Sequence, residues 1–414
     1  MKGRKEGGDF ARLIGLNLDL LRLCGVIPCG TGFFGRNALG CVAFGCLTIY
    51  SISYTYQLIR PMDNLETISE MFTMFLAIVG GQARFSILSA FRATCQRMLK
   101  VCQFFWSTLK PQEKEIVESY AKIMKLLTRC YLATCAFTIL STCAFTMFDQ
   151  TKYLHDSPES VTSPRSMLDG SSIVDNDTTI RRLPYPFFFE VQRTPWYELT
   201  YVLQLLTILN VGLACVAVDT TGPLLILLSC GHFDVIRSRI ERLDAIDQPS
   251  SMGPFSTRET SSSVQTRNLR VLLIRHGMLL EFCNEIERIM NVIFLTQLLG
   301  STYNISLVGF KLIGDNRNKY MHTSQLLIIV IQLFLCNWPA DLLSSKSESI
   351  GRAAYTIPWH WYPRCLRKPT NMLMVRGQKP VRLTAGKFVG LSLETFASMI
   401  STALSFFTVI RSMN

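Results

Sequence analysis

Seven apolar stretches, each close to the length of one membrane-spanning helix, constrain the fold more than any other feature of the sequence. They cover residues 37–59, 67–90, 126–149, 196–229, 288–310, 322–345 and 386–411. An α-helix needs about 20 apolar residues to cross the hydrocarbon core, and it satisfies its own backbone hydrogen bonds, as lipid requires. Charged residues are 17% of the chain, against roughly 25% in soluble domains. We therefore predict an all-α membrane protein with seven transmembrane helices.

Lysine and arginine are concentrated on one side of these stretches. Of the 42 Lys and Arg residues, 29 fall in segments 1–36, 91–125, 230–287 and 346–387, and 10 fall in the segments on the opposite side. The side richer in Lys and Arg is usually cytoplasmic. We predict a cytoplasmic N-terminus and an extracellular C-terminus. Residues 1–36 lack the apolar core of a cleavable signal peptide, so the first span is expected to direct insertion.

The segment 150–195 is then an extracellular loop. It is polar and contains Asn176-Asp177-Thr178, which matches the acceptor triplet for N-glycosylation. Asn176 is therefore a candidate glycosylation site. A second triplet, Asn304-Ile305-Ser306, lies inside the fifth span, where the transferase does not reach it.

Segments 230–287 and 346–385 are expected to be cytoplasmic. Two amphipathic stretches, 234–246 and 266–287, are predicted to extend the fourth and fifth spans, with a linker at 247–263 between them. His276, on the apolar face of the second stretch, is interpreted as a packed core histidine. Prolines between residues 358 and 380 break up any continuous helix, so the seventh helix is predicted in two pieces. Arg84, in the second span, is expected to extend to the lipid headgroups.

The last apolar stretch, 386–411, carries a single polar stripe. Polar residues recur at steps of four and three, which places them on one side of a helix: Glu394, Ser398, Ser401, Ser405, Thr408 and Ser412. Thr384 is the predicted N-cap of this helix. Lipid does not satisfy hydroxyl groups, so the stripe either lines a pore, with one copy per subunit, or packs against another helix. The candidate pore-lining residues are Ser398, Ser401, Ser405, Thr408, Val409 and Ser412.

Other classes of protein find little support. The Lys and Arg residues that give the net charge of +12 are distributed by membrane side, and this distribution does not indicate a nucleic-acid-binding patch. The 14 cysteines contain no CxxC pair and the five histidines are scattered, so neither a metal site nor a disulfide framework is expected. No nucleophile, acid–base or cofactor constellation indicates an enzyme, and no repeated halves indicate a secondary transporter.

Several motifs resemble insect odorant receptors. The segments RGQKP (376–380), LTAGKF (383–388) and SFFTVIR (405–411) resemble the C-terminal signature of that family. SESIGRAAY (347–355) and WHWY (359–362), which follow the sixth span, and PWYELTY (195–201), which enters the fourth, are also similar to it. The resemblance covers roughly the C-terminal half and the overall topology.

The resemblance implies a ligand-gated, non-selective cation channel in the plasma membrane of an olfactory sensory neuron dendrite. It implies a heterotetramer with a shared odorant co-receptor, and no cofactor. It also implies that segments 230–287 and 346–385 form a cytoplasmic helical anchor. The chain lacks the long cytoplasmic insertion of the co-receptor, so a ligand-tuning subunit is expected. A small volatile odorant is expected to bind among the outer halves of helices two, three, four and six. The candidate ligand-binding residues are Met71, Phe72, Phe75, Phe145, Phe148, Tyr201 and Leu205.

Two alternatives stay open from the residues. A seven-helix G-protein-coupled chemoreceptor requires the opposite topology. Asn337-Trp338-Pro339 matches its Trp-x-Pro hinge, but Asp-Arg-Tyr after the third span and Asn-Pro-x-x-Tyr in the seventh are missing. A gustatory-type receptor channel is the second alternative, although the chain ends without the Thr-Tyr…Gln-Phe pattern of that family.

Overall fold

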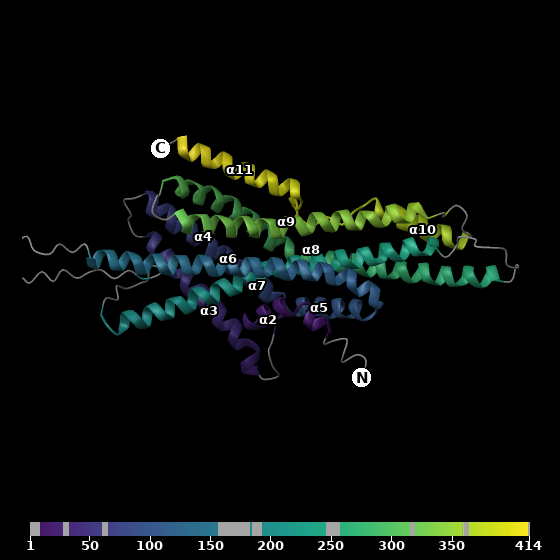
Figure 1. Cartoon of the computed structure of the whole chain (residues 1–414), viewed down its shortest axis with the longest axis horizontal. Coiled ribbons are helices and arrows are strands. Elements are labelled where there is room, and N and C mark those ends of the chain that lie inside the picture. The colour runs from purple at the N-terminus through teal and green to yellow at the C-terminus, as the bar shows by residue number, and fades with distance from the viewer. Residues whose placement is uncertain are drawn as a thin grey trace, which may run out of the picture.

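The computed structural model describes residues 9–27, 33–59, 65–155, 183, 193–245, 257–314, 319–357, 359 and 364–412. The helices form one elongated bundle, with most of the long helices running along its length (Figure 1). The helices are α2 (Gly15–Leu23), α3 (Phe33–Ile59), α4 (Leu65–Ala90), α5 (Arg92–Ser107), α6 (Pro111–His155), α7 (Trp196–Ala245), α8 (Thr257–Gly314), α9 (Lys319–Thr356), α10 (Arg364–Gly377) and α11 (Leu393–Ser412). A short antiparallel hairpin, β1 (Thr384–Ala385) and β2 (Val389–Gly390), lies between α10 and α11.

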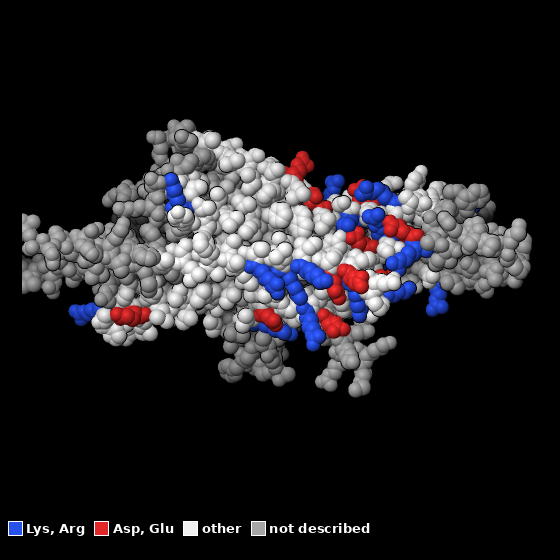
Figure 2. Space-filling model, in the orientation of Figure 1, with Lys and Arg blue, Asp and Glu red and all other residues white. Residues whose placement is uncertain are grey.

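Six described helices, α3, α4, α6, α7, α8 and α9, are long and apolar enough to cross a membrane. α11 covers the last 19 residues, 393–411, of the seventh apolar stretch of the sequence. Lys, Arg, Asp and Glu gather over the half of the molecule that holds α5 and α10, and the described part of the other half of this face carries only a few of them (Figure 2). This division is what a bundle half in lipid and half in water requires. The prediction of an all-α membrane protein is confirmed.

The long helices extend far beyond the thickness of a bilayer. α8 has 58 residues, which at about 1.5 Å per residue gives roughly 87 Å, against a hydrocarbon core of about 30 Å. α7 runs without interruption through Pro223 to Ala245. The predicted extensions of the fourth and fifth spans are therefore confirmed as continuous helices. The predicted linker is shorter than expected, because α8 already begins at Thr257.

α7 occupies the centre of the bundle. Every residue from 216 to 233 is buried, because α7 packs against α6 on one side and α9 on another. A helix that is apolar all round is stable only in such a position. His276 of α8 is also buried, with its ring edge-on to Phe233 of α7 at 6.1 Å between centroids. Its predicted role as a packed core histidine is confirmed.

The seventh helix is divided into α10 and α11, as the prolines predicted, but α11 does not begin at Thr384. Gly386 and Lys387 both have positive φ angles, of 61° and 64°, so the chain reverses here instead of entering a helix. The Thr384 N–H donates to the Glu287 carboxylate of α8 at 2.9 Å. Ser392 is the residue that caps α11, because its Oγ accepts from the Thr395 N–H at 3.1 Å.

Candidate functional site

An ion pair lies in the middle of the bundle. Arg84 of α4 donates from Nη1 to the Asp219 carboxylate of α7 at 2.5 Å, and its Nε donates to the Gly80 carbonyl at 3.1 Å. Both charged residues are buried. The expectation that Arg84 extends to the headgroups is wrong, because an anionic partner inside the bundle satisfies the guanidinium there. An intramembrane charge is retained only when such a partner is present.

Two further side chains complete a polar network around Asp219. Tyr131 of α6 donates its hydroxyl to Asp219 Oδ2 at 2.8 Å. Gln332 of α9 donates to the same oxygen at 2.9 Å and to the Tyr131 hydroxyl at 2.6 Å. Gln297 of α8 in turn donates to Gln332 Oε1 at 3.2 Å. The network therefore ties five helices, α4, α6, α7, α8 and α9, to one buried carboxylate.

A cavity of about 210 Å³ lies against this network. The same five helices enclose it, and Arg84, Tyr131 and Gln332 form part of its wall. The remaining wall is mostly aliphatic or sulfur-containing: Thr73, Met74, Ala77, Ile78, Cys135, Val211, Cys215, Asn304, Val308, Gln325, Ile328 and Ile329. Small-molecule sites have this character, a concave apolar surface with a few placed polar groups.

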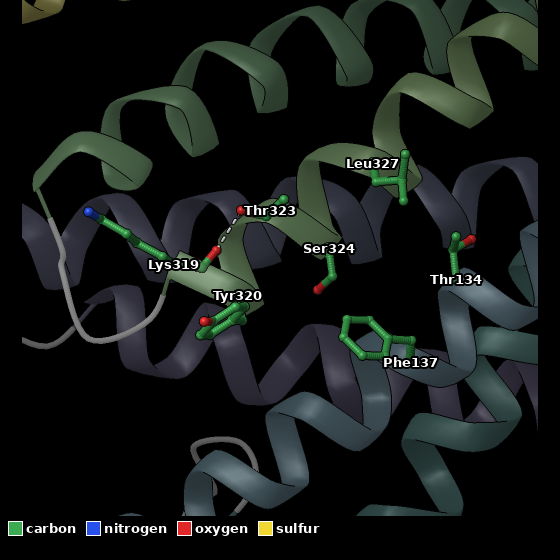
Figure 3. Close-up of a pocket in the computed structure, with 7 residues that line it drawn as sticks. All are labelled: Thr134, Phe137, Lys319, Tyr320, Thr323, Ser324 and Leu327. Carbon is green, nitrogen blue, oxygen red and sulfur yellow. Dashed lines mark hydrogen bonds between the residues drawn. The ribbon is translucent and has the colours of Figure 1, made fainter.

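A second hollow of about 510 Å³ lies between α6 and α9 (Figure 3). Phe137 and Leu327 face it, and both are exposed, as is Tyr320 beside it. Its hydroxyl groups are already used locally, since Thr323 donates to the Lys319 carbonyl at 2.7 Å and Ser324 to the Met321 carbonyl at 2.8 Å. Five of the seven residues that line this outer groove are exposed, whereas every residue that lines the 210 Å³ cavity except Ala77 is buried or half-buried, as suits a small-molecule site. The 210 Å³ cavity is therefore the better candidate site.

α11 packs on α8 and α9 through one side. Ala403 is fully buried, Phe396 lies edge-on to Phe334 of α9, and Met399 is partly buried. From α8, Thr302 lies 3.2 Å from the Met399 sulfur, and Ser306 donates to the Ala403 carbonyl at 3.1 Å. These contacts fix which side of α11 faces its own subunit.

The hydroxyl stripe lies on the opposite side of α11. At 100° per residue, the stripe positions fall about 180° from the packed positions. Ser398, Ser401, Ser405, Thr408 and Val409 are all exposed. Ser405 donates to the Ser401 carbonyl and Thr408 to the Ser405 carbonyl, so their hydrogen bonds to protein are local. The side chain of Ser412 lies outside the described residues. The stripe therefore does not pack within the subunit.

α8 stands between the cavity and α11. Gln297, Asn304 and Val308 are on its cavity side. Thr302 and Ser306, which contact α11, are on the other side of the same helix. A shift of α8 at the cavity is therefore also a shift at α11.

Comparison with known proteins decides the family. The family model described as 7tm odorant receptor matches residues 64–404 of the chain. The chain belongs to the 7tm odorant receptor family. This is a family of membrane receptors and not of enzymes.

Curated relatives and solved structures agree with this assignment. Odorant receptor 13a of Drosophila melanogaster is 27% identical over 255 residues, 57% of this chain and 59% of the relative. Odorant receptor 10 of Aedes albopictus is 23% identical over 56% of this chain and 61% of the relative. The chain thus matches about three-fifths of the length of these relatives. The olfactory receptor OR5 from Machilis hrabei in complex with eugenol has a TM-score of 0.77 at 14% identity, covering 98% of this chain and 100% of that one. At this identity the match shows the fold.

None of the predicted ligand residues that the structure describes is among those that line the cavity. Met71 and Phe75 pack in a small cluster with Tyr54 and Ile78, and Phe72 stacks on Phe75 at 6.5 Å. Tyr201 and Leu205 are half-buried in α7, on the N-terminal side of Val211 and Cys215, which line the cavity. The side chains of Phe145 and Phe148, and the glycosylation candidate Asn176, lie outside the described residues. These assignments stay predictions.

The residues that enclose the cavity carry a signal that sequence reasoning missed. Arg84 and Asp219 are opposite charges inside two apolar stretches, the second and the fourth. Intramembrane charges of opposite sign usually pair, so this rule points to the contact between α4 and α7. The turns of α4 and α7 beside that pair supply Ile78 and Cys215 to the cavity.

Proposed function

We propose that this odorant receptor is the ligand-tuning subunit of an odorant-gated, non-selective cation channel. In this proposal it forms a heterotetramer with the odorant co-receptor in the plasma membrane of olfactory neuron dendrites. The observation that carries the proposal is the position of α8, which lines the 210 Å³ cavity on one side and contacts α11 on the other. A ligand-binding site and a helix suited to line a pore thus share one rigid element.

The ligand is a small, mostly apolar volatile molecule. An engineered cavity of about 150 Å³ binds benzene, and the cavity here measures about 210 Å³. It therefore accommodates a compound slightly larger than benzene. Its aliphatic wall favours hydrocarbon parts of the ligand by the hydrophobic effect.

In this proposal the channel opens because the odorant binds the open conformation more tightly than the closed one. A ligand shifts an equilibrium only as far as it binds one state better. In the proposed open state α11 swings outward, away from the central axis of the assembled channel, and this widens a constriction near Thr408, Val409 and Ser412. The exposed hydroxyls of Ser398, Ser401 and Ser405 then face the water path of the assembled channel, where hydroxyl groups are well solvated.

The proposed topology has the N-terminus and the charged half of the bundle in the cytoplasm. An epitope tag at the N-terminus is then hidden from antibody on intact cells and reached after permeabilisation. Antibody access on intact cells would favour the G-protein-coupled topology instead.

The function is tested by co-expressing the chain with an odorant co-receptor and recording current during application of a panel of volatiles. The proposal predicts odorant-evoked cation current that the co-receptor alone does not give. A surface-expressed pair that responds to no member of a broad panel contradicts it.

A further inference from the structure

One polar atom in the cavity wall has no partner. Asn304 of α8 is 6% exposed and lines the cavity. Its Oδ1 is buried without a hydrogen bond to any of the described residues. Leaving a buried acceptor unsatisfied is unfavourable, and native proteins keep such groups few. An orphaned acceptor in the wall of a ligand site is therefore suited to a donor that the ligand brings.

The other polar groups of the wall are already engaged. Arg84 donates to Asp219 and Gly80. Tyr131 and Gln332 bond to Asp219 and to each other. Each of these side chains already has partners within the network, whereas the Asn304 Oδ1 has none among the described residues.

Thr73 and Gln325 complete the polar wall and are engaged as well. Thr73 accepts from Lys311 at 3.2 Å. Gln325 Oε1 lies 3.4 Å from a ring nitrogen of His322. Among the described polar residues of the wall, Asn304 alone has a buried, unpartnered oxygen.

We propose that Asn304 selects odorants with a hydrogen-bond donor, alcohols and phenols above all, by accepting their hydroxyl proton at Oδ1. The inference rests on the proposed function in placing the ligand in this cavity. The hydrocarbon part of the ligand occupies the aliphatic wall formed by Val211, Ile328 and Ile329. Aldehydes and hydrocarbons of equal size leave the acceptor unsatisfied and bind more weakly.

Two compound series of matched size test the inference: benzyl alcohol, benzaldehyde and ethylbenzene, and hexanol, hexanal and heptane. Direct binding of each compound to the purified chain in lipid nanodiscs is measured by displacement of an environment-sensitive fluorophore. Each alcohol is expected to bind about tenfold more tightly than the hydrocarbon of its series, the effect of satisfying one buried acceptor. This comparison uses the unmodified protein, so it does not depend on whether a variant folds.

The substitution Asn304→Leu removes the acceptor and adds apolar surface. It is expected to abolish the preference for the alcohols and to tighten binding of ethylbenzene and heptane. Asn304→Ala is a second variant, expected to lose the preference as well. Val308→Ala, one turn along on the same wall, is the matched control and should change all members of a series alike.

Equal binding of alcohol and hydrocarbon, no binding of either alcohol, or a preference that survives Asn304→Leu overturns the inference. Current recording from the co-expressed channel is a separate readout. Selective binding without any evoked current contradicts the proposed channel function and leaves the role of Asn304 standing.

Discussion

The guanidinium of Arg84 and the carboxylate of Asp219 lie 2.5 Å apart across 135 residues of sequence, with side chains only 7% and 5% exposed. The pair joins α4 to α7 beside the ligand cavity. Each charge is stabilised by the other, because both side chains are buried away from solvent. The geometry of the cavity wall therefore depends on this contact.

Arg84→Leu leaves Asp219 buried without a counter-charge. Removing one member of a buried pair typically costs about 3–5 kcal/mol. We expect strongly reduced surface expression and a lower midpoint of thermal unfolding for the purified chain. Asp219→Leu should behave similarly, and the double substitution should recover much of the loss.

A surface pair provides the control. Arg237 and Glu241 lie 2.8 Å apart on α7, with side chains 46% and 48% exposed. An exposed pair contributes about 0–1 kcal/mol, so Glu241→Gln should leave the unfolding midpoint nearly unchanged. Equal effects of Arg84→Leu and Glu241→Gln would show that the buried pair has no special role.

Filling the cavity should block odorant action. Ile329→Trp on α9 places a large ring in the 210 Å³ cavity, and overpacking of this kind costs about 1–3 kcal/mol. We expect the odorant concentration for half-maximal current to rise about tenfold or more, at unchanged surface expression. Leu327→Trp, in the outer groove two residues earlier, should have little effect. The reverse result would move the odorant site to the outer groove.

A close approach of two glycines holds α10 against α9. A Cβ added at Gly351 would lie 2.9 Å from the Gly377 Cα, too close for any side chain. Gly377→Ala is expected to destabilise the charged half of the bundle by about 1–3 kcal/mol, seen as faster proteolysis of α10 in the purified chain. At Gly277, where an added Cβ meets nothing within 4 Å, the same change should be neutral or stabilising.

Two thiols in α5 should resist labelling. Burial raises the pKa of Cys95 to about 11 and holds the pKa of Cys102 well above its usual range. The thiolate is the reactive form, so neither residue should react with a maleimide at neutral pH in the folded chain. Mass spectrometry after labelling checks this, and modification of Cys102 without unfolding would contradict its burial.

Much of the fold follows from local pattern. Apolar length predicted the spanning helices, and amphipathic spacing predicted the extensions of α7 and α8. The prolines before α11 correctly predicted a seventh helix in two pieces. These features depend on a residue and its neighbours within a few turns, which is the range over which sequence periodicity is informative.

The cavity is formed by contacts between segments that are far apart in the sequence, and local sequence pattern does not predict such contacts. Local pattern places Arg84 at the headgroups, because its partner Asp219 lies 135 residues away in the sequence. Phe72 and Phe75 have helical spacing, but Met74 and Ile78, on another side of α4, line the cavity. The start of α11 differs from the predicted start because the chain reverses at Gly386 and Lys387, where the φ angles are positive. The hairpin formed there contacts α8, a distant segment that local pattern does not reveal.

The central claim is that odorant in the cavity opens a water path along the exposed side of α11. It is tested most directly by recording odorant-evoked current from the co-expressed channel with Ser405→Cys, before and after a charged, thiol-reactive methanethiosulfonate reagent. The account predicts that the reagent, applied with odorant, suppresses most of the current at Ser405→Cys and leaves Ala403→Cys, on the packed side, unchanged. Unaltered current at Ser405→Cys, with the thiol shown to be modified, would contradict it.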